Sequence, residues 1–205
     1  MKIIVFGATG GVGQHFVRQS LEAGHEVTAF VRTPAKLEVT HENLSVVQGD
    51  AFNRSDVTAA IAGHDAVVSY LGSSTGMKAS TELREMAENI AIGMTEHNVK
   101  RIVYTASAGV HKELTGIVGK IVMLLLKNPL IDHRAAIEHF KAHDLTYTIV
   151  RPMSLSDKEF TGVYRESATN VPDRASSISR ADTAHFILKA LTDSNYDNTS
   201  IGLAT

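Results

Sequence analysis

Short apolar runs alternate with longer amphipathic stretches along the whole chain. The runs are rich in β-branched residues and are separated by about the length of one helix, a spacing typical of buried parallel strands. Predicted strands cover residues 3–6, 26–31, 44–47, 65–72, 101–104 and 145–150, with one more short strand at 160–164. Helical patterns cover 16–21, 55–62, 81–97, 132–143 and 186–191. Because no hairpin signal separates the strands, the order predicts an α/β fold with a doubly wound parallel sheet.

Three glycines follow the first predicted strand at three-residue spacing. Gly7 permits a sharp turn off the strand, Gly10 leaves room for an anion to approach backbone N–H groups, and Gly13 permits close packing of helix on sheet. The helix N-terminus adds unpaired N–H donors and a partial positive charge. This strand–turn–helix context predicts a diphosphate-binding turn of the Rossmann type; a purely structural turn is the alternative. The predicted contacts come from Gly7, Thr9, Gly10, Gly11, Val12 and Gly13.

A cation follows the second predicted strand, where a dinucleotide fold recognises the adenosine ribose. Arg32 lies nineteen residues after Gly13, and Lys36 lies one helical turn further on. An acidic residue at this place accepts ribose hydroxyls, whereas arginine pairs with a 2′-phosphate in a bidentate fork. We therefore predict NADPH as the cofactor, with a solvated strand-end charge as the alternative reading of Arg32.

Ligands of open parallel sheets lie beyond the carboxyl ends of the strands. Asp50 and Ala51 follow the third strand and are predicted to edge an adenine pocket, and Leu71 and Gly72 to flank the middle of the cofactor. The fifth strand leads to a short polar stretch whose serine hydroxyl is predicted to meet the nicotinamide or the substrate. A loop serine is also a common turn residue. The residues of that stretch are Thr105, Ala106 and Ser107.

Composition narrows the possible classes of protein. The chain has 205 residues, 43% of them apolar, which suits one domain over residues 1–205 with a small C-terminal extension on the substrate side. A net charge of −2 without a basic run disfavours nucleic acid as a partner. The chain has no cysteine, and nothing precedes the first strand, so a cytoplasmic protein is expected.

One segment does not fit the alternating pattern. Residues 111–130 are irregular and contain an apolar run, which suits a helix covering the substrate pocket or a dimer contact. The sequence leaves a monomer and a homodimer equally open. The longest apolar stretch, 121–126, is far too short to cross a bilayer, and no membrane association is expected.

The motifs together resemble the atypical short-chain dehydrogenase/reductase group that binds NADPH. The resemblance rests on the turn 7–13, on Arg32, on 105–107 and on 147–152, and it extends over essentially the whole chain. Within the group, 157–164 and 177–186 are most similar to the biliverdin-IXβ reductase/flavin reductase family. The resemblance implies hydride transfer from NADPH to a flavin or a linear tetrapyrrole.

Two departures from these families affect the expected chemistry. No tyrosine has a lysine four residues later, so the Tyr-x-x-x-Lys pair that protonates carbonyl oxygens is absent; Leu130 and Arg134 stand where it would be. Some biliverdin-reductase-like proteins have a pocket histidine where this chain has Ser154. His133 still resembles a family pocket histidine, and Asp132 beside it is expected to favour its protonated form.

Flavin reduction needs little acid catalysis from a protein, because hydride passes to flavin N5 and the proton comes from solvent. Ser107 and His133 are the candidate catalytic residues, and Pro152, Met153 and Ser154 are expected to pack against the nicotinamide. The predicted partner is a small conjugated acceptor, namely a flavin, a tetrapyrrole or a quinone. A non-catalytic NADP(H) sensor of the NmrA-like type is the alternative. The scattered histidines predict no metal site.

Overall fold

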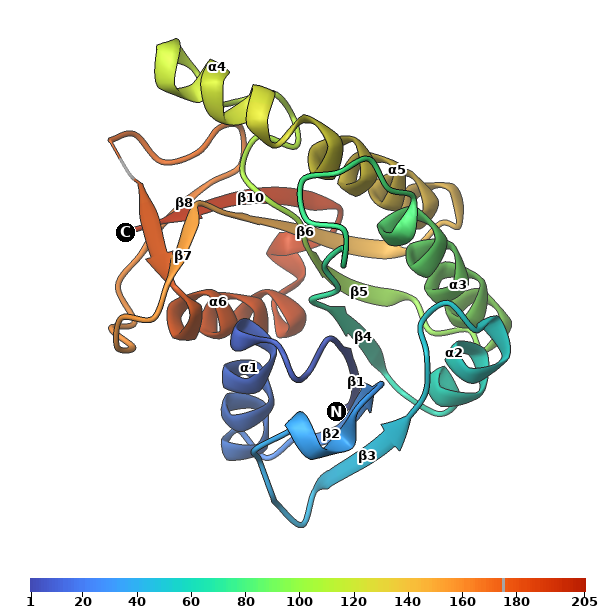
Figure 1. The fold of residues 1–205 in the computed structure, drawn as a ribbon. Helices are drawn as coiled ribbons and strands as arrows, with labels where there is room; N and C mark the ends of the chain where they lie inside the picture. The colour runs from blue at the N-terminus through green and yellow to red at the C-terminus, as the bar shows by residue number, and fades with distance from the viewer. Residues whose placement is uncertain (175) are drawn as a thin grey trace.

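The computed structural model describes residues 1–174 and 176–205 (Figure 1). Over these residues the strands are β1 (Lys2–Phe6), β2 (Glu26–Val31), β3 (Leu44–Gln48), β4 (Ala66–Ser69), β5 (Arg101–Thr105), β6 (Thr146–Pro152), β7 (Ser154–Ser156), β8 (Arg165–Ser167), β9 (Ser177–Ser179) and β10 (Thr199–Ala204). The helices are α1 (Gly11–Glu22), α2 (Arg54–Ile61), α3 (Glu82–Glu96), α4 (Gly116–Leu125), α5 (Lys127–Ala142) and α6 (Arg180–Thr192). Two short 3₁₀ turns cover Pro34–Lys36 and Ser194–Tyr196.

The main sheet has the strand order β3-β2-β1-β4-β5-β6-β10-β8. Every neighbouring pair from β3 to β10 is parallel, and only β8 runs antiparallel, at the edge beside β10. The chain reverses its direction of winding between β1 and β4, which is the switch point at which doubly wound sheets bind ligands. The predicted α/β doubly wound sheet is confirmed.

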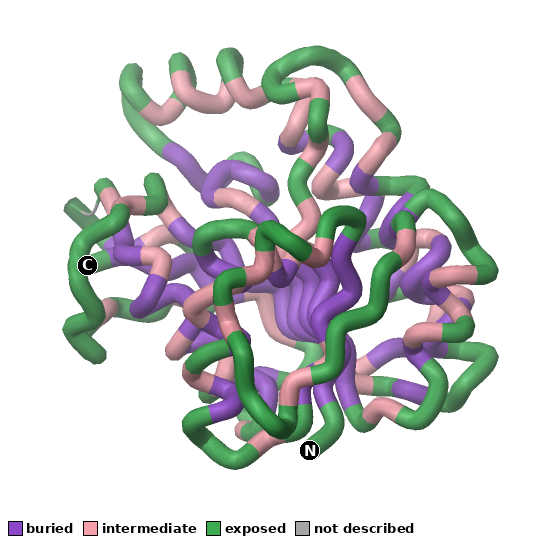
Figure 2. The backbone as a smooth tube through the Cα atoms, turned by 60° about the horizontal axis from the view of Figure 1, so that its bottom comes forward, coloured by how far each residue is buried: buried purple, intermediate pink, exposed green. Residues whose placement is uncertain are grey.

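Two helical layers cover the sheet (Figure 1): α1 and α6 on one face, α2, α3 and α5 on the other. Strand β1 supplies both layers, because successive side chains point to opposite faces. Ile3 and Val5 face α1 and α6, whereas Ile4 and Phe6 face the other layer. Figure 2 shows the result: the central strands are buried along most of their length, whereas the edge strands β3 and β8, the loops and the outer helix faces carry exposed residues. This burial on both faces explains why the strands read as continuous apolar runs.

The short strand predicted at 160–164 is wrong. The structure places the extra edge strand, β8, immediately afterwards, and β8 pairs with β10 through Gly202 and Ser167. Residues 161 and 162 are instead held by Asp182 of α6, whose carboxylate accepts hydrogen bonds from the Thr161 and Gly162 amides at 3.0 and 2.8 Å. A tertiary hydrogen bond thus decides a segment whose composition suits a strand.

Helix α5 begins five residues earlier than its predicted start at Asp132. The earlier start includes Pro129, which suggests a break in a sequence pattern. Proline is tolerated in the first turn of a helix, because its missing N–H has no intrahelical partner there. The preceding apolar segment forms α4, so the irregular stretch 111–130 is largely helical.

Candidate nucleotide and acceptor site

The glycine turn between β1 and α1 has no room for side chains at two of its positions. Gly7 has a φ of +81°, and a Cβ atom there would lie 2.9 Å from the backbone oxygen of Tyr70. A Cβ atom on Gly13 would lie 2.3 Å from the carbonyl oxygen of Gly7. Glycine is therefore required at position 7 for both its backbone conformation and its close contact with Tyr70, and at position 13 for its close contact with the Gly7 carbonyl.

The first turn of α1 keeps its N–H groups available for a ligand. Gly10 is the N-cap, and no side chain of the described residues caps the helix. The Gly10 carbonyl accepts from the Gln14 amide at 2.9 Å, so the amides of Gly11, Val12 and Gly13 precede the first intrahelical bond. Uncapped amides at the positive end of a helix suit a diphosphate.

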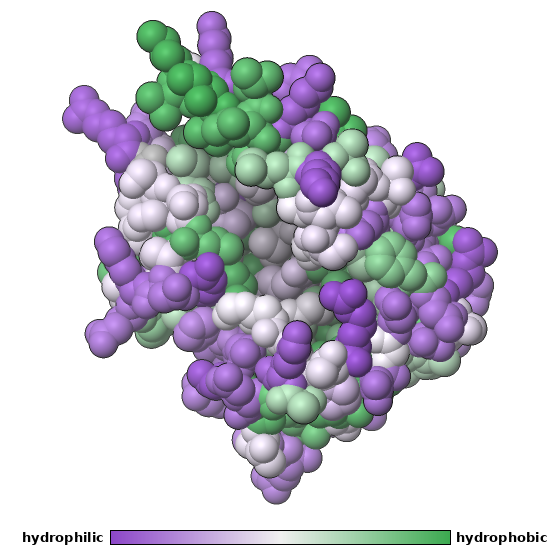
Figure 3. Space-filling view, viewed as in Figure 1, coloured by the Kyte–Doolittle hydropathy of each residue, from purple (hydrophilic) through white to green (hydrophobic). Residues whose placement is uncertain are grey.

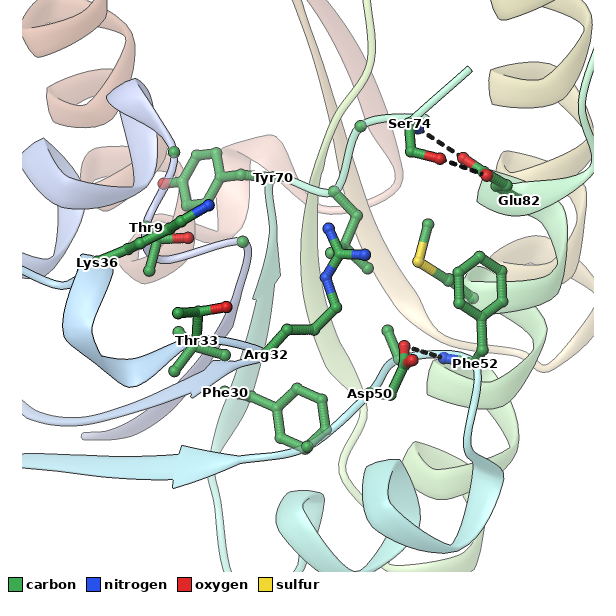
Figure 4. Close-up of a pocket in the computed structure, with 18 residues that line it drawn as sticks. Thr9, Phe30, Arg32, Thr33, Lys36, Asp50, Phe52, Tyr70, Ser74 and Glu82 are labelled. Atoms are coloured by element: carbon green, nitrogen blue, oxygen red, sulfur yellow. Dashed lines mark hydrogen bonds between the residues drawn. The ribbon is translucent and has the colours of Figure 1, made fainter. Parts of the chain in front are cut away.

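A cavity of about 230 Å³ opens beside this turn, beyond the carboxyl ends of β1, β2 and β4 (Figure 4). Many of the residues predicted from the sequence to bind cofactor line it together. These are Gly7, Thr9, Gly10, Arg32, Lys36, Asp50, Ala51, Leu71 and Gly72. The structure thus brings four separate stretches of the chain to one cavity.

Arg32 extends into the middle of this cavity, with Thr9 and Lys36 on one side of it and Asp50 and Phe52 on the other (Figure 4). Neither Arg32 nor Lys36 forms an ion pair with any residue that the structure describes. Two exposed, unpaired cations in a concave site attract an anion, and the planar guanidinium suits a phosphate.

The wall around Asp50 is held in place by hydrogen bonds. The Asp50 carboxylate accepts from the Phe52 amide at 3.1 Å. Asn89 of α3 donates from Nδ2 to the carbonyl oxygens of Ala51 and Phe52 at 3.0 and 3.1 Å. This side of the cavity is therefore fixed by α3 before any ligand enters, as a slot for a planar base requires.

Glu82 closes the cavity at the β4 side (Figure 4). Its carboxylate accepts from the Ser74 amide and hydroxyl, both at 2.6 Å, and from the Ser73 hydroxyl at 2.9 Å. These hydrogen bonds favour the ionised form and hold the pKa of Glu82 below its usual value. The loop after β4 is thereby tied to the start of α3.

A second group of predicted residues lies at the ends of β5 and β6. The Ala106 amide donates to the Val150 carbonyl at 2.8 Å, and the Ala108 amide donates to the Pro152 carbonyl at 3.1 Å. These bonds hold the two strand ends side by side. Within the described part of the chain, the Ser107 hydroxyl donates only to the adjacent Ala108 carbonyl, at 3.2 Å. The structure thus brings the stretch 105–107 and the start of the 152–154 stretch to the same edge of the sheet.

The hydroxyl of Thr105 is buried without a hydrogen-bond partner within 1–174 and 176–205. The same holds for the hydroxyl of Tyr70, which lines the cavity beside the glycine turn. Burying a polar group without a partner is costly, so such groups are candidates for ligand contacts. Together with the uncapped first turn of α1, they fit a dinucleotide that runs from the cavity toward β5.

Pro152, Met153 and Ser154 differ in their surroundings. Pro152 ends β6 and is buried, and the Met153 amide donates to the Leu203 carbonyl at 2.9 Å. Ser154 begins β7, is exposed, and pairs with Ser177 of β9. Ser154 is therefore held in the small β7–β9 sheet, a pairing that the sequence does not predict.

His133 on α5 lies against Tyr104 on β5, with 2.8 Å between Nδ1 and the phenolic oxygen. Asp132 does favour the protonated form of His133, as expected, but a larger effect opposes it. Burial lowers the pKa of His133 to about 4, and the opposing effect of Asp132 is smaller. Burial also raises the pKa of Tyr104 far above its usual value. Both side chains are therefore neutral at pH 7.

The Asp132 carboxylate has a different partner from the one predicted. It accepts hydrogen bonds from the Leu83 and Arg84 amides at 3.1 and 3.0 Å and from the Ser80 hydroxyl at 2.9 Å. Asp132 thus caps the N-terminus of α3 from the neighbouring helix α5. This cap explains a buried carboxylate on a core-facing helix.

Helix α4 exposes most of its apolar side chains. Its inner side rests on the core through Met123 and the adjoining Leu126. The outer side forms an apolar patch, seen in Figure 3 above the hollow at the centre of this face. Its exposed residues are Ile117, Val118, Ile121, Leu124 and Leu125. The sequence alternatives for this segment, a pocket cover and a dimer contact, both stay predictions.

Sequence reasoning missed several residues that line the cavity. They are Phe30, Val31, Thr33, Gly49, Phe52, Tyr70, Ser74, Glu82 and Met86. Phe30, Val31 and Tyr70 belong to or follow strands already predicted, so the rule that ligands lie at strand ends is a signal that points to them. Glu82 and Met86 come from α3, and no local pattern indicates that this helix edges the cavity.

The described residues contain neither a metal-type cluster of side chains nor a helix that could span a membrane. No cluster of three or more His, Cys, Asp or Glu side chains in them has the arrangement of a metal site. None of their helices has the length and apolarity needed to cross a membrane.

Fold, glycine turn and cavity together define a protein of the nicotinamide-dinucleotide-binding Rossmann class. The chain belongs to the NAD(P)H-binding family, whose model matches residues 7–194. This match confirms the NAD(P)-binding part of the predicted resemblance, and the fold is consistent with the short-chain dehydrogenase/reductase group.

Solved structures share the whole fold. A short-chain dehydrogenase/reductase from Veillonella parvula in complex with NADP superposes with a TM-score of 0.84 at 20% identity, over 100% of this chain and 94% of that one. ChuY, an anaerobilin reductase from Escherichia coli O157:H7, has a TM-score of 0.83 at 20% identity, over 100% of this chain and 97% of that one.

Similarity in sequence is more local. A 3-beta-hydroxysteroid dehydrogenase from Mycolicibacterium neoaurum is 34% identical over 123 residues, which are 53% of this chain and 32% of that protein. The alignments to this and the next relatives, which include a 2-alkyl-3-oxoalkanoate reductase from Stenotrophomonas maltophilia, span about a third of those proteins' own length.

Proposed function

We propose that this protein is an NADPH-dependent oxidoreductase that transfers hydride to a flavin or a similar conjugated acceptor. The observation that supports it best is Arg32, an unpaired guanidinium in the cavity beyond β2. It stands where a carboxylate would select NADH, and it favours a 2′-phosphate instead. Lys36 adds a second positive charge.

In this proposal the chain binds the cofactor along the edge of the sheet. Asp50 and Ala51 edge the adenine, the α1 amides hold the diphosphate, and Leu71 and Gly72 flank the middle of the molecule. Thr105 and Ser107 donate hydroxyl hydrogen bonds near the nicotinamide, and this end is backed by Pro152 and Met153. The bound dinucleotide supplies the hydride; the protein orients it and excludes water.

The side chains favour an acceptor that needs no strong protein acid. Among the described residues the only tyrosine–histidine contact near the end of β5 is Tyr104–His133, and both groups are neutral and tightly held. A carbonyl needs a proton donor as hydride arrives, whereas a flavin takes its proton from solvent. Ser107 and His133 therefore act in positioning the acceptor rather than as a strong acid.

The test is turnover with a panel of acceptors. Purified protein is mixed with NADPH and, separately, FMN, a quinone and a linear tetrapyrrole, and the loss of the reduced-nicotinamide absorbance is followed. The tetrapyrrole is included because a fold neighbour, ChuY, is an anaerobilin reductase. We expect NADPH oxidation with at least one acceptor and a slower reaction with NADH. Tight NADPH binding without any turnover would instead favour a non-catalytic sensor.

A further inference from the structure

Arg180, the first residue of α6, lies against the glycine turn. A Cβ atom placed on Gly11 would be 2.5 Å from Cδ and 2.7 Å from Nε of Arg180. The arginine side chain therefore occupies the space that a side chain at position 11 would fill. Gly11 begins α1, and α1 and α6 lie side by side on the same face of the sheet (Figure 1).

This position is electrostatically unusual. Gly11 is in the first turn of α1, where the helix dipole is positive and where a cation is disfavoured. The uncapped amides of that turn add to the positive potential. A guanidinium beside them is stabilised when an anion binds between the two, so this part of the surface is suited to a diphosphate.

Asp157 partners Arg180 in the structure. Its carboxylate lies 2.5 Å from a terminal nitrogen of Arg180, and the Asp157 side chain is 87% exposed. An ion pair with one partner this exposed contributes little net stability and exchanges readily. The Asp157 carboxylate therefore competes only weakly for the Arg180 guanidinium. A diphosphate carries two negative charges and can accept a bidentate pair of hydrogen bonds from it.

We propose that Arg180 is a ligand of the cofactor diphosphate and that Asp157 holds its guanidinium in the free protein. This inference rests on the proposed binding of a nicotinamide dinucleotide to the α1 turn. It adds a residue from the far end of the sequence to a site otherwise built from β1 to β6. Because the diphosphate is common to NADPH and NADH, Arg180 contributes equally to both, unlike Arg32.

The first experiment measures dissociation constants by calorimetry for wild type and Arg180→Gln. We expect the variant to bind NADPH and NADH about tenfold more weakly, by similar factors. The fragment 2′-AMP, which has no diphosphate, is expected to bind both proteins equally. Arg180→Lys retains the charge without the fork and is expected to fall between the two. Thermal unfolding of each variant separates loss of a contact from loss of fold.

Asp157→Asn provides the opposite prediction. Removing the competing carboxylate frees Arg180, so this variant is expected to bind both dinucleotides a few-fold more tightly. Lys158→Gln is the matched control, because Lys158 adjoins Asp157 and its replacement changes the local charge without touching Gly11. It is expected to leave both dissociation constants unchanged.

A double-mutant cycle tests the contact itself. A methyl group from Gly11→Ala would displace the Arg180 side chain, so the substitution is expected to weaken cofactor binding in wild type. In the Arg180→Gln protein, which lacks the long guanidinium, the same substitution is expected to cost much less.

The outcomes separate this inference from the proposed function. Wild-type protein that binds neither dinucleotide would overturn both. Wild-type protein that binds NADPH tightly, with a folded Arg180→Gln variant of unchanged affinity, would overturn the role of Arg180 alone. Weaker binding by Asp157→Asn would also contradict it.

Discussion

Tyr104 and His133 form a hydrogen-bonded pair between β5 and α5, with 2.8 Å between the phenolic oxygen and Nδ1. Their rings meet edge to face, and Tyr104 also packs against Phe140 of α5. Because burial keeps the imidazole neutral, the pair joins strand and helix without a charge. It lies next to the strand end that delivers Thr105 and Ser107 to the sheet edge.

The lowered pKa of His133 predicts a pH dependence of stability. In the unfolded chain His133 takes up a proton below about pH 6.5, whereas in the folded protein it does so only near pH 4. The unfolded state therefore binds more protons within this window, and folding stability decreases as pH falls from about 6.5 to 4. The expected loss is at most about 3 kcal/mol, with full stability above pH 6.5.

Urea unfolding at several pH values measures this effect. His133→Gln is expected to remove its share of the pH dependence and to leave the contributions of other histidines with lowered pKa values. Those are His25, His111 and His139. Identical pH profiles for wild type and variant would show that His133 titrates normally.

Arg32→Ala tests the choice of cofactor. Loss of a charge-assisted contact to the 2′-phosphate is expected to weaken NADPH binding by about 1.5–3 kcal/mol and to leave NADH binding unchanged. Lys36→Ala is expected to do the same by a smaller amount. Lys100→Ala is the control, because Lys100 immediately precedes β5 and so lies at the amino ends of the strands, away from the cavity. A variant of Arg32 with undiminished preference for NADPH would exclude this residue from phosphate recognition.

Asp132→Ala tests the cap that α5 provides for α3. Removing the carboxylate leaves the Leu83 and Arg84 amides and the Ser80 hydroxyl without this acceptor. We expect the free energy of unfolding to fall by about 1–3 kcal/mol, measured with urea. Glu138→Ala, on an exposed position of the same helix, is expected to change it by less than about 0.5 kcal/mol. Equal effects of the two substitutions would argue against the cap.

Glu113→Gln tests a buried ion pair with Arg151, which lies near the end of β6. The guanidinium of Arg151 is fully buried and pairs with Glu113, which is almost as buried. The variant leaves a buried charge uncompensated and is expected to lose about 3–5 kcal/mol of stability. Replacing both residues by apolar ones, as in Glu113→Leu with Arg151→Met, is expected to recover part of the loss. If the Glu113→Gln protein were as stable as wild type, the ion pair would not contribute as proposed.

The sequence by itself determined the features that depend on neighbours in the chain. Strand β1, the glycines at 7, 10 and 13 and helix α1 follow from apolar periodicity and from the backbone freedom of glycine. The cap of α6 by Ser179 is equally local, since its hydroxyl accepts from the amide of Asp182 three residues later. Because parallel strands end at one edge, the same reasoning also placed Arg32 and Asp50 near each other.

Only the tertiary structure decided which distant groups meet. The Asp132 carboxylate binds the amides of α3, and burial of His133 lowers the pKa of this histidine more than the charge of Asp132 raises it. Both results depend on how the helices pack together, which residue spacing along one helix does not reveal. The wall contributed by Glu82 and the approach of Arg180 to Gly11 arise in the same way. Periodicity shows that a face is buried, but not which residue lies opposite, so the chemistry of this site depends on packing.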